Sequence, residues 1–519
     1  MQKRETRRGT TSRQNRRDAD MTGKIRWGHR CAALLLAAVT LAAGGCARGG
    51  ESSLPEASSQ PAESTAASTD STTPSDTTGG ETTGSESGDA GTTTRRTDSK
   101  TTTRGGGKTT TAKPTTTTEA EKPGANGKIR IGGFCGVDPN FADKQHIREI
   151  AEAGFDYVMV EAGFHPMVLK KIGEWCKEYG LQWYFTDDKL YGHNAPFDKS
   201  GETVKTYKDY GGFAGNLLRD EPGASQFDAL GKGVATYTKQ VPGKQAIINL
   251  LPMYATNAAL EASSYQDYIN AYVKKVPTNY ISVDIYPCTR MSDGTKTTWE
   301  GYAENLNIVA TAARKSGREF WGFLQALTWS SGHREPDETD IRWQAYSHLA
   351  FGAVNLIYFT YRTPDDNGGE KFTPALIDRS GKKTDTWYAA QKVNKEINAL
   401  SDVYMQYKSV GAYSHGYHSA VPYLRFDNQY TGAKAIQSIQ CDSPLLVGCF
   451  EKKSGKGSGY MVVNMSELQD KETASMKLSI PGAKTVTAHM GGKSVKLTAS
   501  GGTYALRLGC GEGAFITVE

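Results

Sequence analysis

The strongest constraint on the fold is a regular alternation of short apolar runs with helix-like segments, which begins at Lys128. The succession of strand, helix, glycine and strand is the βα unit of parallel sheets, and runs that are apolar throughout suit strands covered on both faces. Eight runs follow one another, at residues 129–134, 157–162, 182–186, 217–221, 246–251, 281–286, 320–326 and 356–361. Eight units in about 275 residues match the usual length of an eightfold βα barrel.

We therefore predict an α/β fold, a (β/α)8 TIM barrel over residues 128–405. The alternative is an open doubly wound sheet, which requires a Gly-rich phosphate loop after its first strand. Glycines do occur at residues 131–136, but they lack the GxGxxG spacing and no strong helix follows directly. Beyond the barrel the pattern changes to short alternating runs separated by Gly, Ser and Asn, which predicts a smaller C-terminal β-sandwich at 406–519.

Residues 1–46 have the pattern of an N-terminal extension and an export signal. Met21 is the predicted true start, because a basic segment and the 12-residue apolar run Ala32–Ala43 follow it. That run is too short to span a bilayer. The small residues before Cys46 resemble a bacterial lipoprotein signal, with Cys46 as the lipidated residue, although Ala43 stands where Leu is usual. The alternative is an ordinary secretory signal. The expected location is the outer face of a bacterial membrane, with Cys46 as anchor, or the medium.

The segment that follows, residues 47–127, consists mainly of Ser, Thr, Gly, Pro and charged residues, so we predict a disordered linker. Residues 1–30 alone hold ten basic and three acidic side chains against a net charge of +5 for the chain, so the remainder is close to neutral and no nucleic-acid partner is expected. The cysteines beyond Cys46 lack metal-binding spacing, and Cys441 and Cys449 are expected to be two thiols rather than a disulfide. No metal or cofactor is predicted.

Acidic side chains mark the ends of four of the eight runs. In a barrel these carboxyl ends gather at one face, where the active site lies. The acids are Glu161, Asp187 with Asp188, Asp220 with Glu221, and Asp284. Amides and aromatic residues stand at the other ends: Asn249, Tyr286, Gln325, Trp329, Tyr358 and Tyr361. Carboxylates and amides bind hydroxyl groups and aromatic rings stack on pyranose faces, so the pattern predicts an oligosaccharide or polysaccharide substrate.

Each of these residues also has a purely structural interpretation. Pro222 can open a helix, in which case Glu221 is an acid that the helix dipole favours. Asp220 can simply pair with Arg219. Asp284 lies within an apolar run, where an unpaired charge is costly, so it is either paired or functional. Glu161 can be a charge of the barrel rim.

The motifs at these strand ends resemble those of clan A glycoside hydrolases, especially the β-galactosidase-like branch around family 42. The resemblance rests on four segments: Arg219–Pro222 (RDEP), Ser282–Pro287 (SVDIYP), Phe320–Gln325 (FWGFLQ) and 341–361. It implies that Glu221 is the general acid/base. It also implies a nucleophilic Glu at the end of the seventh strand, where this chain has Gln325, and an Asn where it has Asp220.

These departures leave three alternatives. Asp284 or Glu161 is the nucleophile, or the enzyme inverts with a carboxylate acting as base on water, or the barrel binds sugar without cleaving it. We expect a tethered extracellular glycoside hydrolase of β-linked oligosaccharides, with Glu221 as acid and Asp284 as its leading partner. The main alternative is a surface glycan-binding lipoprotein without catalysis. A weaker one is a scaffold that attaches to the cell wall through its sandwich.

Overall fold

The computed structural model describes residues 127–329, 332–366, 370–416 and 421–519. The predicted export signal, the lipidated Cys46 and nearly all of the predicted linker lie outside these residues. Among the described residues, no helix is both long and apolar enough to span a bilayer. In the same residues, no group of three or more His, Cys, Asp or Glu side chains could hold a metal ion.

The predicted barrel is confirmed, and each of the eight predicted runs overlaps one of its strands. These are β1 (Arg130–Val137), β2 (Tyr157–Val160), β3 (Gln182–Phe185), β4 (Phe213–Asp220), β5 (Gln245–Asn249), β6 (Tyr280–Val283), β9 (Glu319–Gln325) and β10 (Ala353–Phe359). They pair in parallel in the order β5-β4-β3-β2-β1-β10-β9-β6. A parallel bridge between Leu250 and Val283 joins the two end strands, with Leu250 N donating to Ser282 O at 3.0 Å.

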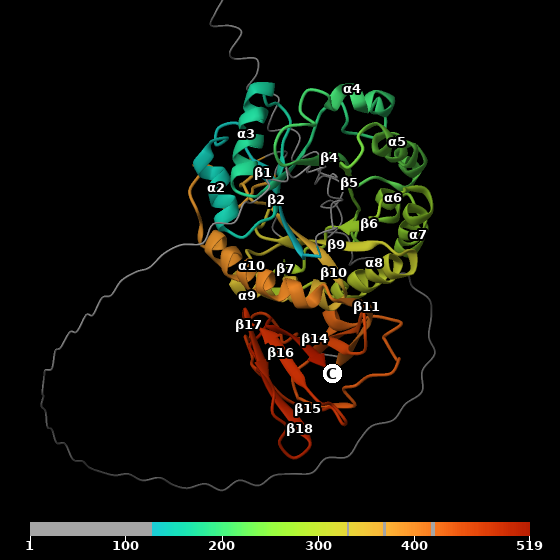
Figure 1. Ribbon diagram of the computed structural model, residues 1–519, viewed down its shortest axis with the longest axis vertical. Coiled ribbons are helices and arrows are strands. Elements are labelled where there is room, and N and C mark those ends of the chain that lie inside the picture. The colour runs from blue at the N-terminus through green and yellow to red at the C-terminus, as the bar shows by residue number, and fades with distance from the viewer. Residues whose placement is uncertain (1–126, 330–331, 367–369, 417–420) are drawn as a thin grey trace, which may run out of the picture. The chain divides into compact units, whose positions relative to one another are not determined.

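Helices surround the ring of strands (Figure 1). They are α2 (Lys144–Glu152), α3 (Pro166–Glu178), α4 (Ser200–Val204), α5 (Phe227–Gln240), α6 (Asn257–Leu260), α7 (Tyr265–Lys275), α8 (Tyr302–Ser316), α9 (Glu338–Ala350) and α10 (Asp385–Tyr404). Short 3-10 helices lie at Phe197–Lys199, Ala224–Gln226 and Pro422–Leu424. Several helices begin at polar side chains that accept the first free backbone amides, for example Asp143 before α2 and Ser264 before α7.

Aromatic side chains fill the barrel interior. Trp321 of β9 stacks on Tyr280 of β6, with ring centroids 3.8 Å apart and an interplanar angle of 13°. Both rings are fully buried, in a cluster that also contains Tyr157 and Tyr184. Trp321 therefore belongs to the core of the barrel. Because these rings fill the interior between the strands, a ligand can bind only at the carboxyl ends of the strands.

The C-terminal region is the predicted pair of antiparallel sheets. One sheet has the order β11-β13-β14-β19-β16-β17 and the other β12-β15-β18, with an apolar core of their own. The strands are β11 (Tyr407–His415), β12 (Ser438–Gln440), β13 (Leu445–Lys452), β14 (Ser458–Asn464), β15 (Ala474–Ser479), β16 (Val486–Met490), β17 (Lys493–Lys496), β18 (Thr503–Leu508) and β19 (Gly513–Val518). Cys441 and Cys449 are both free thiols, as expected.

Helix α9 joins the barrel to these sheets. Every residue of α9 from Asp340 to Ala350 is buried, because strands β9 and β10 cover one side while β13 and β14 cover another. The contact is close: a Cβ atom added at Gly448 of β13 would lie 2.1 Å from the carbonyl oxygen of Ala350. Arg342 bridges Glu338 and Glu396 at 2.7 and 2.9 Å and so links α9 to α10.

One element has no counterpart in the sequence prediction. After β6 the chain forms a hairpin of β7 (Cys288–Arg290) and β8 (Lys296–Thr298). The hairpin is short and mostly polar, so it lacks the apolar run by which the barrel strands are identified. It directly follows Asp284 and Tyr286, and it thereby becomes part of the surroundings of the strand-end acids.

Candidate active site

Three acids and one amide meet where β4, β5 and β6 end. Asp220 is the last residue of β4 and pairs in register with Asn249, the last residue of β5. Asp284 follows β6, and Glu221 follows Asp220 directly. The carboxyl groups of Glu221 and Asp284 lie within hydrogen-bonding reach of each other, and the Asn249 side chain lies within reach of both Asp220 and Asp284.

A bulge in β4 aims Asp220 at this cluster. Leu217 faces the barrel interior, so simple alternation would place Arg219 inside and Asp220 outside. The register between β4 and β5 shifts between Leu217 and Arg219, and this shift turns the order around. As a result Arg219 donates to Gln226 at 3.1 Å, while Asp220 is buried like Asp284 and lies beside the half-buried Glu221. Bulges commonly redirect a side chain beside an active site.

The orientation of Asn249 is fixed by a serine. Ser282 Oγ donates to Asn249 Oδ1 at 2.8 Å, and both side chains are buried. The amide nitrogen of Asn249 therefore faces the acids, where it can donate. The sequence prediction assigned no role to Ser282. Its spacing of two residues before Asp284 was the available signal, because residues two apart on a strand share a face.

The backbone of Glu221 adopts a left-handed conformation. Glu221 has φ of 48°, which is unfavourable for a residue with a side chain, and its amide nitrogen donates to Asn249 O at 2.9 Å. Such conformations cost about 1–3 kcal/mol and are found mainly where surrounding structure enforces them, often at functional sites. The strain places the Glu221 carboxyl beside Asp284, since a regular continuation of β4 would turn it away.

Burial and mutual repulsion hold these acids protonated to unusually high pH. Burial is the largest cause for all three, and each is also affected by its neighbours. The pKa of Asp220 rises to about 6 and that of Asp284 to about 8, the latter also through the charge of Asp220. The pKa of Glu221 rises well above its usual value because of burial and the charges of Asp284 and Asp220. One oxygen of each acid is buried and receives no hydrogen bond from a described residue.

Tyrosines surround the acids. Tyr286 is buried, and its pKa is raised by burial and by the nearby charge of Asp284. Tyr254 is not among the predicted site residues. Burial and the charges of Asp284 and Glu221 raise its pKa, and its ring packs edge-to-face on Trp299 with centroids 5.0 Å apart. Trp329 packs on Tyr286 at 5.0 Å but is itself 97% buried under His333, whose ring stacks on it at 4.2 Å. Trp329 is therefore not the open stacking surface that was expected.

Several other residues predicted to bind substrate are bonded to protein groups in this structure. Tyr358 points to the outer layer, where its hydroxyl donates to Asn394 of α10 at 2.8 Å. The hydroxyl of Tyr361 accepts from Trp387 of the same helix at 3.3 Å. Asp187 accepts from the Tyr207 hydroxyl at 2.8 Å and from the backbone of its own loop.

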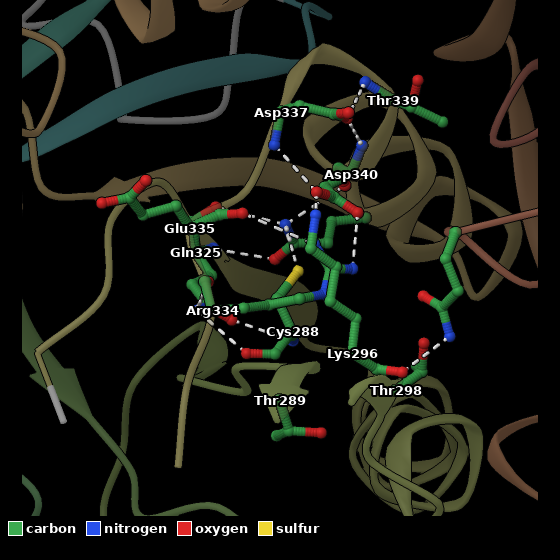
Figure 2. A network of polar contacts seen from close by, with 12 residues as sticks. Cys288, Thr289, Lys296, Thr298, Gln325, Arg334, Glu335, Asp337, Thr339 and Asp340 are labelled. Atoms are coloured by element: carbon green, nitrogen blue, oxygen red, sulfur yellow. Dashed lines mark hydrogen bonds and ion pairs between the residues drawn. The ribbon is translucent and has the colours of Figure 1, made fainter. Parts of the chain in front are cut away.

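Glu161 is at the end of β2, as predicted, and lies 3.5 Å from Arg362, which in turn lies 3.3 Å from Asp138. Gln325 is fully buried, and both polar atoms of its amide are bound to backbone atoms (Figure 2). Its side chain therefore has no free group to offer a sugar.

A cleft of about 810 Å³ lies in the C-terminal sheets, away from the acids. Its lining includes His415, Lys477 and Arg507, and none of the described lining residues is Trp, Tyr or Phe.

We expect the acids to make the protein less stable as pH rises from 6.5 to 8. Over this range unfolded Asp and Glu are ionised, whereas the folded cluster retains protons, so the unfolded state binds fewer protons and stability falls. Each retained proton contributes a slope of about 1.4 kcal/mol per pH unit. Urea unfolding at four pH values would measure the slope, and Asp284→Asn should flatten it.

The buried histidines do not cause the loss of stability that we expect between pH 6.5 and 8. Burial lowers the pKa of His333 and His348 to about 4, so their contribution to stability is lost only as pH falls below the usual histidine range near 6.5. Equal slopes for the parent and Asp284→Asn would show that Asp284 is ionised at neutral pH.

Comparison with known proteins supports the assignment of the barrel. The family model for β-galactosidase, glycoside hydrolase family 42, matches residues 246–400, a stretch that includes Asn249, Asp284 and Gln325. Asp220 and Glu221 lie before it. No curated protein matches the chain.

Several solved structures are similar to this chain at low sequence identity. A catalytic mutant of the family-42 β-galactosidase from G. stearothermophilus aligns with a TM-score of 0.50 and 8% identity, over 76% of this chain and 98% of that one. The β-galactosidase from Bacillus circulans sp. alkalophilus aligns with a TM-score of 0.48 and 11% identity, over 76% and 99%. The β-galactosidase from the psychrophilic Marinomonas ef1 has a TM-score of 0.41 and 11% identity, over 55% and 62%. Residues 246–400 are therefore similar to the family-42 β-galactosidases, and the chain shares its barrel fold with one of them.

Proposed function

We propose that the protein hydrolyses β-linked oligosaccharides, with Glu221 as the general acid. The observation that carries the proposal is the contact between the Glu221 and Asp284 carboxyl groups in a buried site at the strand ends. A general acid for glycoside cleavage must hold its proton near neutral pH and release it to the leaving oxygen. Burial and two neighbouring acids give Glu221 that property, since ionising it places a further negative charge beside Asp284 and Asp220.

Asp284 acts in this proposal by setting the protonation state of Glu221. Nucleophile and acid stand about 5–5.5 Å apart in retaining enzymes, and base and acid about 6.5–9.5 Å apart in inverting ones. The Asp284 carboxyl lies within hydrogen-bonding reach of Glu221. We propose that the second catalytic acid is a different residue, and Glu161, 3.5 Å from Arg362 after β2, is the candidate base for an inverting reaction.

The test is hydrolysis of a panel of aryl β-glycosides and plant and host oligosaccharides by the purified chain. Cleavage of any member supports the proposal, and NMR of the first product identifies the second acid. An inverted anomer supports a distant base such as Glu161, and Glu161→Gln should then remove activity. A retained anomer would require a nucleophile and exclude the role proposed for Glu161.

A second candidate function is glycan binding without cleavage. It is favoured by Gln325, because the strand-seven position where the clan places its nucleophile holds a buried amide that is bound on both sides. Saturable binding of an oligosaccharide by both the parent and Glu221→Gln, with no cleavage by the parent across the panel, would favour this alternative.

We further propose that the protein works outside the cell, anchored by a lipid on Cys46. The supporting observation is the signal-like sequence before Cys46. Cells given radiolabelled palmitate should label the parent and leave Cys46→Ala unlabelled, and this variant should move from the membrane fraction to the soluble one. A labelled Cys46→Ala protein would exclude this anchor.

A further inference from the structure

The amide of Gln325 connects three segments at the mouth of the barrel. Its Oε1 accepts from the backbone nitrogen of Cys288 at 2.9 Å. Its Nε2 lies 3.3 Å from the carbonyl oxygen of Cys288 and 3.2 Å from those of Leu327 and Arg334. Gln325 therefore binds both polar backbone groups of Cys288, and Figure 2 shows it beside Cys288 and Arg334.

Cys288 belongs to the segment that carries the site. It lies four residues after Asp284 and two after Tyr286, at the start of the β7–β8 hairpin. The loop after β9 adds to the same hairpin, with Arg334 N donating to Cys288 O at 3.1 Å and Arg290 N donating to Gly332 O at 3.0 Å. Whatever holds Cys288 in place therefore also fixes the direction in which the chain leaves β6.

Gln325 is itself held by a second glutamine. Gln344 of the buried helix α9 accepts from the backbone nitrogen of Gln325 at 2.8 Å and donates to its carbonyl oxygen at 3.2 Å. Both glutamine side chains are fully buried. Two amides in series thus connect helix α9, strand β9 and the segment after β6. Buried amides that are fully satisfied in this way give a rigid connection.

We propose that Gln325 is a positioning residue that holds Asp284 against Glu221 by fixing the backbone at Cys288. This inference rests on the proposed function only for the catalytic meaning of the Glu221–Asp284 contact. It also explains the amide at the strand-seven position. A glutamate there would lack the amide N–H donors and would place a carboxylate against three carbonyl oxygens. The residue at this position therefore has a positioning role in this chain.

The test compares Gln325→Met with Tyr358→Phe. Met has nearly the same size as Gln but no amide, while Tyr358→Phe removes a buried hydrogen bond of the neighbouring strand on the side away from the acids. Two properties are measured: the change of urea stability between pH 6.5 and 8, and kcat and KM for the substrate that is cleaved best.

The expected result is that Gln325→Met loses at least half of the parent's pH slope and lowers kcat at least tenfold with KM changed less than threefold. Tyr358→Phe should keep both properties while losing stability. Gln344→Met, which removes the support of Gln325, should act in the same direction more weakly, and it replaces Gln325→Met if that variant does not fold. Gln325→Glu should lower stability and kcat instead of restoring a nucleophile.

A Gln325→Met variant that loses stability but keeps the parent's slope and kcat would overturn the proposal. The slope needs no substrate, so it separates the two hypotheses. If the parent cleaves nothing while Gln325→Met loses the slope, the positioning role stands and hydrolysis falls. Enhanced activity of Gln325→Glu would contradict the positioning role and support a nucleophile at that place.

Discussion

Glu221→Gln is expected to lower kcat/KM for an unactivated oligosaccharide by about 10²- to 10⁴-fold, the range that general acids contribute. Gln keeps the size of the side chain and removes the proton that the leaving oxygen requires. A substrate whose leaving group needs no proton, such as a dinitrophenyl glycoside, should lose much less. The comparison of the two substrates therefore identifies an acid, because a misfolded site would lose both reactions equally.

The pH dependence of kcat/KM is an independent test of Glu221 as the general acid. In the parent, kcat/KM should decline at alkaline pH as the acid ionises, and its raised pKa places this decline well above the usual range of Glu. A matched control is Asp187→Asn, because Asp187 also ends a strand but is bonded to Tyr207. Equal losses in the two variants would contradict the assignment of Glu221 as the acid.

Asp340→Asn is expected to lower the free energy of unfolding by about 3–5 kcal/mol, as removal of one partner from a buried ion pair does. Arg334 and Asp340 form a bidentate pair at 2.6 and 2.7 Å, and both side chains are about 4% exposed. The variant leaves the guanidinium of Arg334 without its charge partner in the interior (Figure 2). Urea unfolding would measure the change.

A neighbouring residue provides the control for this pair. Asp337 bonds Lys471 of the C-terminal region at 2.7 Å in an exposed pair and also caps α9. Asparagine caps helices about as well as aspartate, so Asp337→Asn removes only the exposed ion pair and should cost no more than about 1 kcal/mol. A loss at Asp340 as small as that at Asp337 would contradict the importance of burial.

The strands could be predicted from the sequence because each is a continuous apolar run, and the acids could be found because they interrupt such runs. The direction in which a side chain points at a strand end could not be predicted from the sequence. The regular alternation of side chains along β4 places Asp220 on the outer face, whereas the bulge after Leu217 turns its side chain to the inner face. Tyr358 was expected in the site, yet it lies on the outer face because its neighbour Phe359 occupies the inner one.

The roles of Gln325 and Trp329 depend on loops distant in sequence. Gln325 is enclosed by the backbone of Cys288 and Arg334, and Trp329 is covered by His333. Neither contact has a periodic pattern that would reveal it. A single sequence therefore predicts which residues are near the mouth of the barrel, but only packing decides which of them face a ligand.

The burial of α9 also limits how this protein can be divided. If the chain ended after α10, the side of this helix that faces the C-terminal sheets would meet water, and this side includes Trp343 and Tyr346, which lie against Gly511 and Gly513. The barrel is thus not a transferable module, although sequence inspection suggests a boundary near residue 405. A truncated protein that loses sugar binding would reveal an unfinished barrel core and say nothing about a binding role of the sandwich. Replacing the C-terminal sheets by those of another protein would require a surface that matches this helix.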